Sequence, residues 1–587
     1  MVNKLLIKYK NMHYLKLFVV FFLVSIISFS QNETSNLAQT LEEVISSYQD
    51  HKGYDRKGYP LGLFTRDYYK AEAEFAKTKL EELSKIRTDT FSENEKISVE
   101  LLKFVLQDQI DFYEFERFLN PLLSDSGFHS SLNYMVRSLS NYKKTKEYLN
   151  KLNALPDFVN QHFVNLREGL KKGVSQPRVI FKGYESTYNE HITDNYEDNF
   201  FYSPFKDLPE SLTEFQKDSV LIAAKSAIEK NVIPQFKRIK EFFETEYLPK
   251  TRTTIGVSNT PNGNAYYQNR INFYTTSTQY TADDIHQIGL KEVARIRAKM
   301  EQIIKDLNFE GSFADFLQFL RTDEQFYAKT PKELLMIARD MAKRADEQLP
   351  RFFKTLPRKP YGVAPVPDAI APKYTGGRYI GTSKNSTEPG YYWVNTYNLP
   401  SRTLYTLPSL TVHEAVPRHH LQASLNNELG DSIPKFRKEL YLSAYGEVWG
   451  LYCEFLADEM GMYTTPYEHF GQLTYEMWRA YRLVVDTGIH TKGWSRNQVV
   501  DYMSSNTALS LHEINTETDR YISWPGQALS YKIGELKIRE LRKKAKTELG
   551  SKFDIREFHE VILGQGTVTL SILENLINSY IEKMKNE

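Results

Sequence analysis

The sequence predicts a mainly α-helical protein with one small β-sheet. Over most of its 587 residues, apolar side chains recur at intervals of three and four among charged ones, which is the pattern of amphipathic helices. One long segment, residues 361–407, is instead rich in turns and aromatic residues and fits short strands better. No internal repeat indicates a solenoid. We therefore expect a large helical body that holds a sheet in one place.

Helical patterns fill the first half of the chain. The first two span residues 36–48 and 66–85. A later helix has a clear start signal, because Thr281 is a capping residue and Asp283 and Asp284 place negative charge in the first turn. The other helices of this half are predicted at residues 96–118, 129–152, 154–172, 209–246, 281–306, 312–321 and 331–348, and from residue 409 the chain is helical again to its end.

Two turn-rich segments are predicted as strands and loops, at residues 256–280 and 361–407. Within the second segment, residues 389–396 form a strand pattern that ends shortly before a histidine-rich stretch. We expect this strand either to lie at an exposed sheet edge or to support the helix that follows it. A small sheet should therefore stand beside that helix.

The amino terminus has the pattern of a secretory signal peptide. Basic residues precede an apolar run at residues 17–27, and Ser28 and Ser30 offer small side chains before a cleavage site. We predict a signal peptide at residues 1–30 and an exported mature chain at residues 31–587, in the periplasm or outside the cell. No cysteine follows the cleavage site, so we expect no stable membrane anchor once the signal is removed.

The charge balance excludes one broad class of partner. The chain has 75 Lys and Arg against 74 Asp and Glu, so it lacks the basic field of a nucleic-acid-binding protein. The single cysteine, Cys453, cannot form a disulfide within the chain. No linker or charge block separates the two halves, so we predict one undivided mature region and leave the oligomeric state open.

Three histidines and a glutamate gather in one short stretch. His413, Glu414, His419 and His420 fall within eight residues, and a second acidic helix carries Glu447 further along the chain. Two neutral imidazoles and a remote carboxylate hold Zn²⁺ and leave one position open for water. A glutamate beside the first histidine can take the proton of that water. The stretch therefore predicts a catalytic zinc site.

The spacing of these histidines departs from the usual helical zinc motif, in which the two ligands are four residues apart. Pro417 stands at that fourth position. In an unbroken helix His420 would lie about 10 Å along the axis from His413, too far for two bonds of about 2 Å to one metal. Pro417 lacks an N–H and interrupts helices, so a break there can bring His419 or His420 back. We favour His420 as the second ligand, with His419 as the close alternative.

The same residues resemble a known family. The stretch from His413 to Gln422, HEAVPRHHLQ, looks like the HEAxPGHHxQ signature of the bacterial domain of unknown function 885 family, which is grouped with the gluzincin-type zinc peptidases. Four further segments resemble blocks of that family, so the resemblance covers nearly all of the mature chain. These segments are residues 390–395, 447–454, 485–490 and 525–534.

The resemblance implies a large, two-lobed, helical zincin-like metallopeptidase fold, a zinc cofactor and short peptides as substrates. The residues that match the family's site are the ligands His413, Glu447 and His419 or His420, and the general base Glu414. One residue departs from the signature, because Arg418 stands where the family pattern has glycine. If that turn requires a positive φ, the arginine adds strain on the order of 1 kcal/mol.

A later helix, at residues 478–490, has a polar stripe that suits a substrate cleft. Arg479 and Arg482 are predicted to bind a substrate carboxylate, because the guanidinium fork matches that group. His490 is predicted to hold the tetrahedral intermediate of a hydrolysis. A solvated face with local ion pairs is the alternative explanation of the stripe.

Two further pairs of residues are predicted at the site. Tyr521 and Tyr531 are candidate phenolic donors to the oxyanion. If the strand at residues 389–396 is an edge strand, its backbone can pair with an extended peptide. Tyr391 and Asn395 are then the predicted substrate contacts.

The sequence therefore predicts a secreted or periplasmic zinc peptidase in which Glu414 is the base. The first alternative is a non-catalytic peptide-binding protein or decayed peptidase, and Arg418 is its best support. A purely structural zinc site fits less well, since such sites usually have four protein ligands. The second alternative is a zinc amidase that acts on cell-wall peptides, because the same activated water attacks any of these carbonyls.

Overall fold

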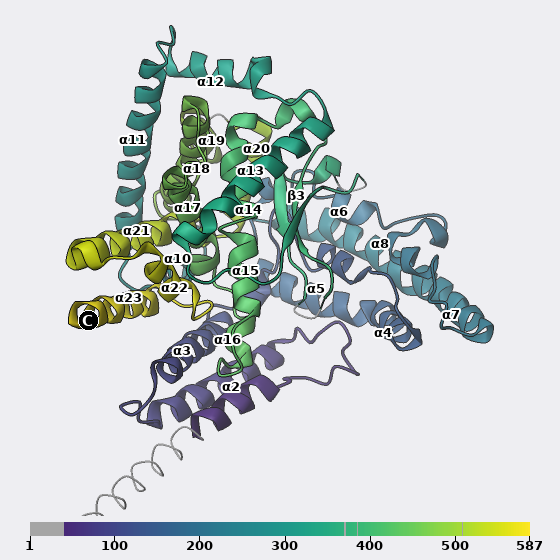
Figure 1. Ribbon diagram of the computed structural model, residues 1–587. Coiled ribbons are helices and arrows are strands. Elements are labelled where there is room, and N and C mark those ends of the chain that lie inside the picture. Colours follow the sequence, from purple (N-terminus) through teal and green to yellow (C-terminus); the bar gives the residue numbers. More distant parts are fainter. Residues whose placement is uncertain (1–39, 369–370, 384–385, 508) are drawn as a thin grey trace, which may run out of the picture.

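The computed structural model describes residues 40–368, 371–383, 386–507 and 509–587. The predicted signal peptide lies outside this range. The described residues are mainly helical and contain one three-stranded sheet, as the sequence predicts (Figure 1). None of the described helices is long and apolar enough to cross a membrane.

The first two long helices begin at side-chain caps. The helix α2 (Arg66–Lys85) has the predicted bounds, and the Thr65 hydroxyl accepts the N–H of Tyr68. The helix α3 (Glu93–Glu114) starts with a capping box between Ser92 and Glu95. The helices that follow are α4 (Tyr142–Asn153), α5 (Leu155–Lys172), α6 (Ser186–Asn189), α7 (Glu214–Ala227), α8 (Ile233–Glu241) and α9 (Leu248–Lys250).

The segment at residues 256–280, predicted as strands and loops, forms the helix α10 (Gly263–Thr275) instead. Its buried positions Tyr267, Arg270, Ile271 and Tyr274 do follow helical spacing. An arginine and two tyrosines on that face hide the apolar pattern. Tertiary contacts therefore stabilise a helix that the local sequence pattern does not predict.

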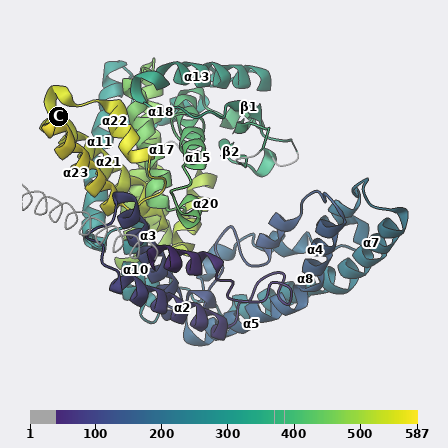
Figure 2. The same ribbon diagram turned by 60° about the horizontal axis from the view of Figure 1, so that its bottom comes forward.

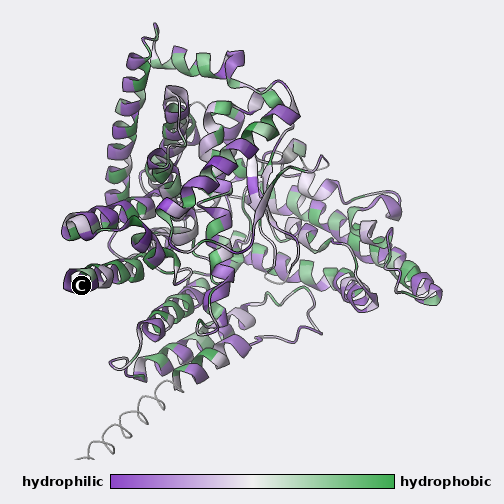
Figure 3. Cartoon of the chain, in the orientation of Figure 1, coloured by the Kyte–Doolittle hydropathy of each residue, from purple (hydrophilic) through white to green (hydrophobic). Residues whose placement is uncertain are grey.

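The helix α11 (Ala282–Asp306) starts at the predicted Thr281, whose side chain forms a capping box with Asp284. It runs along the buried helix α18 (Pro466–Thr491). Gly289 allows this close approach, because a Cβ there would lie 2.8 Å from the Cβ of Leu483. In Figure 3, hydrophilic and hydrophobic residues alternate along α11, as on an outer amphipathic helix. The next helices are α12 (Phe313–Thr322) and α13 (Pro331–Phe352).

The sheet lies in the predicted segment, and its strand order decides between the two positions considered for the strand at residues 389–396. Its strands are β1 (Tyr361–Pro365), β2 (Gly377–Ile380) and β3 (Gly390–Val394), in the order β1-β3-β2. The strand β3 is parallel to β1 and antiparallel to β2. Both sides of β3 are thus occupied, so it is not the free edge strand that would pair with a peptide. Strand order depends on the path of the whole segment, which the pattern of one strand does not reveal.

The carboxy-terminal half is helical, as predicted. Its helix α17 (Ser443–Glu459) packs closely on α21 (Ser530–Leu549), because Gly534 of α21 leaves room for Val448. The remaining helices are α14 (Leu407–Glu414), α15 (His419–Asn427), α16 (Lys435–Glu439), α17 (Ser443–Glu459), α19 (Arg496–Asn506), α20 (Leu511–Ser523), α21 (Ser530–Leu549), α22 (Ile555–Leu563) and α23 (Leu570–Asn586).

Two large hydrophobic clusters form the core. The first contains residues of α3, α13, α14, α17, α21, α22 and α23. The second contains residues of α4, α5, α7, α8, α18, α19 and α20. Figure 2 shows a V-shaped outline, in which α4, α5, α7 and α8 diverge from the limb that carries the sheet. The elements of the candidate site come from both clusters, since α14 and α17 belong to the first and α18 to the second.

Candidate metal centre

The helix that carries the histidine motif is broken at the predicted proline. The helix α14 ends at Glu414 and α15 begins at His419. The Val416–Pro417 peptide between them is cis, and the N–H of His420 donates to the carbonyl of Ala415 at 3.0 Å across the break. This interruption allows residues on the two helices to face each other.

The break does not require glycine at position 418. Arg418 has φ −99°, so the positive φ under which an arginine would be strained does not occur. The departure from the family signature therefore carries no backbone penalty of that kind.

Three predicted ligands come together at the break. One ligand atom from each of His413, His419 and Glu447 lies within 4.8 Å of the others. The two imidazole rings are nearly perpendicular, with centroids 5.5 Å apart. Ligands of a tetrahedral zinc ion lie roughly 3.4 Å from one another, so small side-chain shifts suffice to close the site.

His420, the histidine favoured from the sequence, does not join this cluster. Its Nε2 is 2.9 Å from the carbonyl oxygen of Lys359, and its Nδ1 is 3.1 Å from the hydroxyl of Tyr379. Successive residues of a helix point about 100° apart, so α15 can direct only one of its first two histidines at His413. The structure brings the alternative, His419, to the triad.

A buried carboxylate orients His413. Glu454 Oε1 lies 2.6 Å from His413 Nδ1, which leaves the other ring nitrogen for a metal. Burial raises the pKa of Glu454 to about 7, against the opposing charges of Arg479 and Arg418. Burial, reinforced by Arg418, lowers the pKa of His413 well below its usual value, so the imidazole is neutral as a ligand must be.

The predicted base, Glu414, lies beside the triad. Its Oε2 accepts the backbone N–H of Tyr379 at 2.8 Å and lies 3.7 Å from His419 Nε2. Burial raises the pKa of Glu414 to about 7, although Arg418 and the N–H of Tyr379 oppose the rise. A carboxyl group with such a pKa can both accept and donate a proton near neutral pH. The strand that hydrogen-bonds to the predicted base is thus β2.

Two residues hold the carboxylate of Glu447. Arg418 Nη2 lies 2.5 Å from its Oε2, and the hydroxyl of Tyr441 donates to Oε1 at 2.8 Å. Burial alone would raise the pKa of Glu447, but Arg418, His419 and Tyr441 lower it to about 2. The sequence analysis missed Tyr441 and Tyr379, because no spacing rule connects a tyrosine in a loop or strand with a distant carboxylate.

The comparisons with known proteins identify the family. The family model described as bacterial protein of unknown function (DUF885) matches residues 51–577. The chain belongs to this family.

Two solved structures have folds similar to that of this chain. A crystal structure described as the putative lipoprotein from Colwellia psychrerythraea is 26% identical, has a TM-score of 0.84, and the match covers 93% of this chain and 99% of that one. A putative lipoprotein of unknown function from Shewanella oneidensis is 17% identical with a TM-score of 0.70, over 94% and 99% of the two chains, which shows the fold alone. No curated protein matches this chain.

In this DUF885 protein, His490 and Tyr521 are engaged elsewhere. His490 Nε2 lies 2.9 Å from the carbonyl of Tyr521, and its Nδ1 lies 3.2 Å from the N–H of Val257. The hydroxyl of Tyr521 donates to Glu517 at 2.7 Å and accepts from Arg482 at 2.9 Å. Both side chains are buried and hydrogen-bonded, so their polar atoms are already engaged and are not free for the predicted catalytic roles.

The arginine stripe of α18 is buried, which excludes the solvated face considered from the sequence. Arg479 Nη2 lies 3.6 Å from Glu454, so this arginine supports the carboxylate that orients His413. Arg482 pairs with Glu517 at 3.1 Å and lies over the ring of Tyr531 at 4.7 Å. No hydrogen bond joins the Tyr531 hydroxyl to another described residue, so Tyr531 keeps a free donor.

The residues predicted on β3 are not at the triad. The amide nitrogen of Asn395 donates to three carbonyls, those of Ala371, Tyr374 and Thr375, and the side chain is fully buried. Tyr391 packs against Gly362 of the neighbouring strand. The prediction of substrate contacts at these two positions came from treating β3 as an edge.

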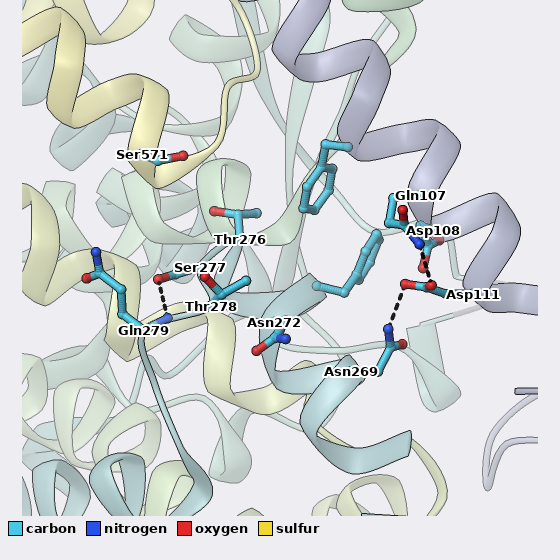
Figure 4. A pocket seen from close by; sticks show the side chains of 12 residues that line it. Gln107, Asp108, Asp111, Asn269, Asn272, Thr276, Ser277, Thr278, Gln279 and Ser571 are labelled. Atoms are coloured by element: carbon cyan, nitrogen blue, oxygen red, sulfur yellow. Dashed lines mark hydrogen bonds between the residues drawn. The ribbon is translucent and has the colours of Figure 1, made fainter. Parts of the chain in front are cut away.

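A separate hollow of about 330 Å³ lies between α3, α10 and the start of α23 (Figure 4). In it, Gln107 and Asn269 donate to the carboxylate of Asp111 at 2.8 and 2.6 Å. No residue of the metal centre lines this hollow. We therefore place the candidate chemistry at the histidines and not in this hollow.

Proposed function

We propose that this DUF885 protein is an exported, zinc-dependent peptidase that hydrolyses short peptides. One observation carries the proposal: two histidines and a glutamate converge within 4.8 Å, and a second glutamate lies beside them. The basic and apolar amino terminus supports export. The family and its solved relatives are described without an activity, so the site geometry is the main support.

The residues fit a catalytic zinc ion. His413, His419 and Glu447 would hold it with two nitrogens and one oxygen, which leaves one position open. Glu454 fixes the ring of His413, as carboxylates do beside many zinc ligands. When bound, zinc supplies Lewis-acid polarisation of a carbonyl and makes water more acidic.

The chain itself supplies proton transfer. Glu414 accepts a proton from water as that water attacks the peptide carbonyl, and then delivers it to the leaving nitrogen. The N–H of Tyr379 holds the Glu414 carboxylate in place throughout. Tyr531, whose ring lies 4.7 Å from the guanidinium of Arg482, would be a phenolic donor to the oxyanion.

The decisive test compares Glu414→Gln with wild type and with Glu439→Gln, whose exposed side chain lies on α16. Each protein is loaded with zinc, analysed for metal content, and incubated with a peptide mixture whose products are read by mass spectrometry. We expect Glu414→Gln to keep its zinc and lose about 100-fold or more of the cleavage rate, because a general base contributes that much. Glu439→Gln should match wild type. Full activity of Glu414→Gln would refute the assigned role of this residue.

A further inference from the structure

A buried arginine lies inside the candidate metal centre. Arg418 is fully buried, and its Nη2 contacts Glu447 Oε2 at 2.5 Å and the carbonyl of Gly446 at 3.3 Å. Its Nε and Nη1 have no hydrogen-bond partner among the described residues. A permanent positive charge thus contacts one of the three groups that would bind the metal.

The fold holds this charge in place. A Cβ at Gly450 would collide with Nε of Arg418 and lie 2.9 Å from Cε1 of His413, so the glycine leaves room for both side chains. The indole of Trp449 donates to the carbonyl of Pro417 at 3.0 Å and so fixes the residue before the arginine. The guanidinium is therefore packed beside the imidazole and cannot swing into solvent.

This fixed charge has two opposite effects on a metal. By binding Glu447 it holds a ligand in position, which favours metal binding. It also repels a divalent cation at short range, in a buried place where water and salt screen poorly. Tyr441 also holds Glu447, so the loss of Arg418 leaves the ligand oriented. Among the described residues, the other group hydrogen-bonded to this carboxylate is the neutral hydroxyl of Tyr441, which does not offset the repulsion, so the repulsion should dominate.

We propose that Arg418 is a built-in counter-cation that weakens metal binding at this centre. The inference rests on the proposed metal site. Without metal, the guanidinium of Arg418 balances the negative charge of Glu447, so the buried carboxylate can remain ionised. With metal, the carboxylate of Glu447 would be shared between two cations, so the centre would bind its ion less tightly than the three ligands alone would.

The test measures zinc affinity by competition with a chromogenic chelator for wild type, two neutral variants and one charged variant. We expect Arg418→Met and Arg418→Gln to bind zinc at least tenfold more tightly than wild type. Arg418→Lys keeps the charge and should stay within threefold of wild type. Two neutral variants of different polarity are used so that failure of one to fold, judged by circular dichroism, leaves the other as the test.

The outcomes separate this inference from the proposed function. If wild type binds zinc and a folded neutral variant gains no affinity, Arg418 does not act as a counter-cation, although the metal site stands. If Arg418→Lys gains as much as Arg418→Met, shape and not charge controls binding, and the inference fails. If wild type binds no zinc but a neutral variant does, the inference holds in its strongest form. Absence of binding in every protein overturns both.

Discussion

The carboxylate of Glu454 decides which nitrogen of His413 faces the centre. Its Oε1 lies 2.6 Å from Nδ1 of His413. Nη2 of Arg479 lies 3.6 Å from the same oxygen and balances part of the negative charge of Glu454. All three side chains are buried. In such an environment a neutral histidine with one bonded nitrogen presents the other as a ligand. One glutamate thus controls both the tautomer and the orientation of the first ligand.

The choice between the two adjacent histidines can be tested by single substitutions. His419→Ala should lose stoichiometric zinc, because it removes one of the three converging groups. His420→Ala should keep its zinc but lose about 1–3 kcal/mol of unfolding free energy, because the buried contacts with Lys359 and Tyr379 are lost. Elemental analysis and urea unfolding measure the two effects. Loss of zinc in His420→Ala but not in His419→Ala would instead identify His420, the histidine favoured from the sequence, as the ligand.

At the scale of elements, α18 joins other helices through buried polar groups. Asp486 accepts the hydroxyl of Tyr267 from α10 at 2.6 Å and the N–H of Gly526 at 3.1 Å. Lys532 of α21 is fully buried and pairs with Glu476 of α18 at 2.8 Å and with Glu535 at 2.9 Å. These contacts fix how α18 sits against its neighbours and hence where Arg479 meets the metal centre.

Asp486 should make stability depend on pH. Burial raises its pKa to about 7, although the bonds from Tyr267 and Gly526 oppose the rise. Because the folded pKa exceeds the unfolded one, the stabilising contribution is full in acid and disappears as the pH rises through about 7. Wild type should therefore lose on the order of 2 kcal/mol between pH 5 and pH 8 relative to Asp486→Asn, which does not titrate.

Urea unfolding of both proteins at the two pH values measures this difference, since all other titrations are common to them. Asp501→Asn is the control, because Asp501 is exposed on α19 and its replacement should leave the pH dependence unchanged. Parallel stability curves for wild type and Asp486→Asn would show that the carboxyl is ionised in the folded protein at pH 5.

At the scale of the whole molecule, the candidate metal centre lies where the two hydrophobic clusters meet. His413 and Glu447 stand on helices of one cluster, and Arg479 reaches Glu454 from a helix of the other. A ligand that binds only the folded state stabilises it, so a metal here should act on the entire fold.

Zinc should therefore raise the melting temperature of wild type and not of His413→Ala. At a free concentration of one hundred times Kd the gain is about 2.7 kcal/mol, or about 2 °C for a chain of this size. A chelator should reverse the shift without unfolding the protein, because Arg418 pairs with Glu447 when the metal leaves. Differential scanning calorimetry measures both steps. An equal shift in His413→Ala would mean that zinc binds elsewhere.

Much of the fold could be predicted from local patterns. Helical spacing and side-chain caps placed α2 and the start of α11 at the correct residues, and turn-rich composition located the sheet. The helix α10 was missed because Arg270 and its tyrosines interrupt the apolar face that signals a helix. The position of β3 stayed open between an edge and a supporting strand, because one strand pattern fits both equally well.

The sequence by itself determined that His413 and Glu414 share a helix end, that Pro417 breaks this helix, and that a remote glutamate is a candidate third ligand. These are properties of neighbouring residues and of helix geometry. Only the tertiary structure decided that His419 and not His420 faces His413, and that Arg418 contacts Glu447. Both outcomes depend on the direction that α15 takes after the break at Pro417 and on the packing of the distant helix α17 near it. The spacing of residues along the chain predicts neither.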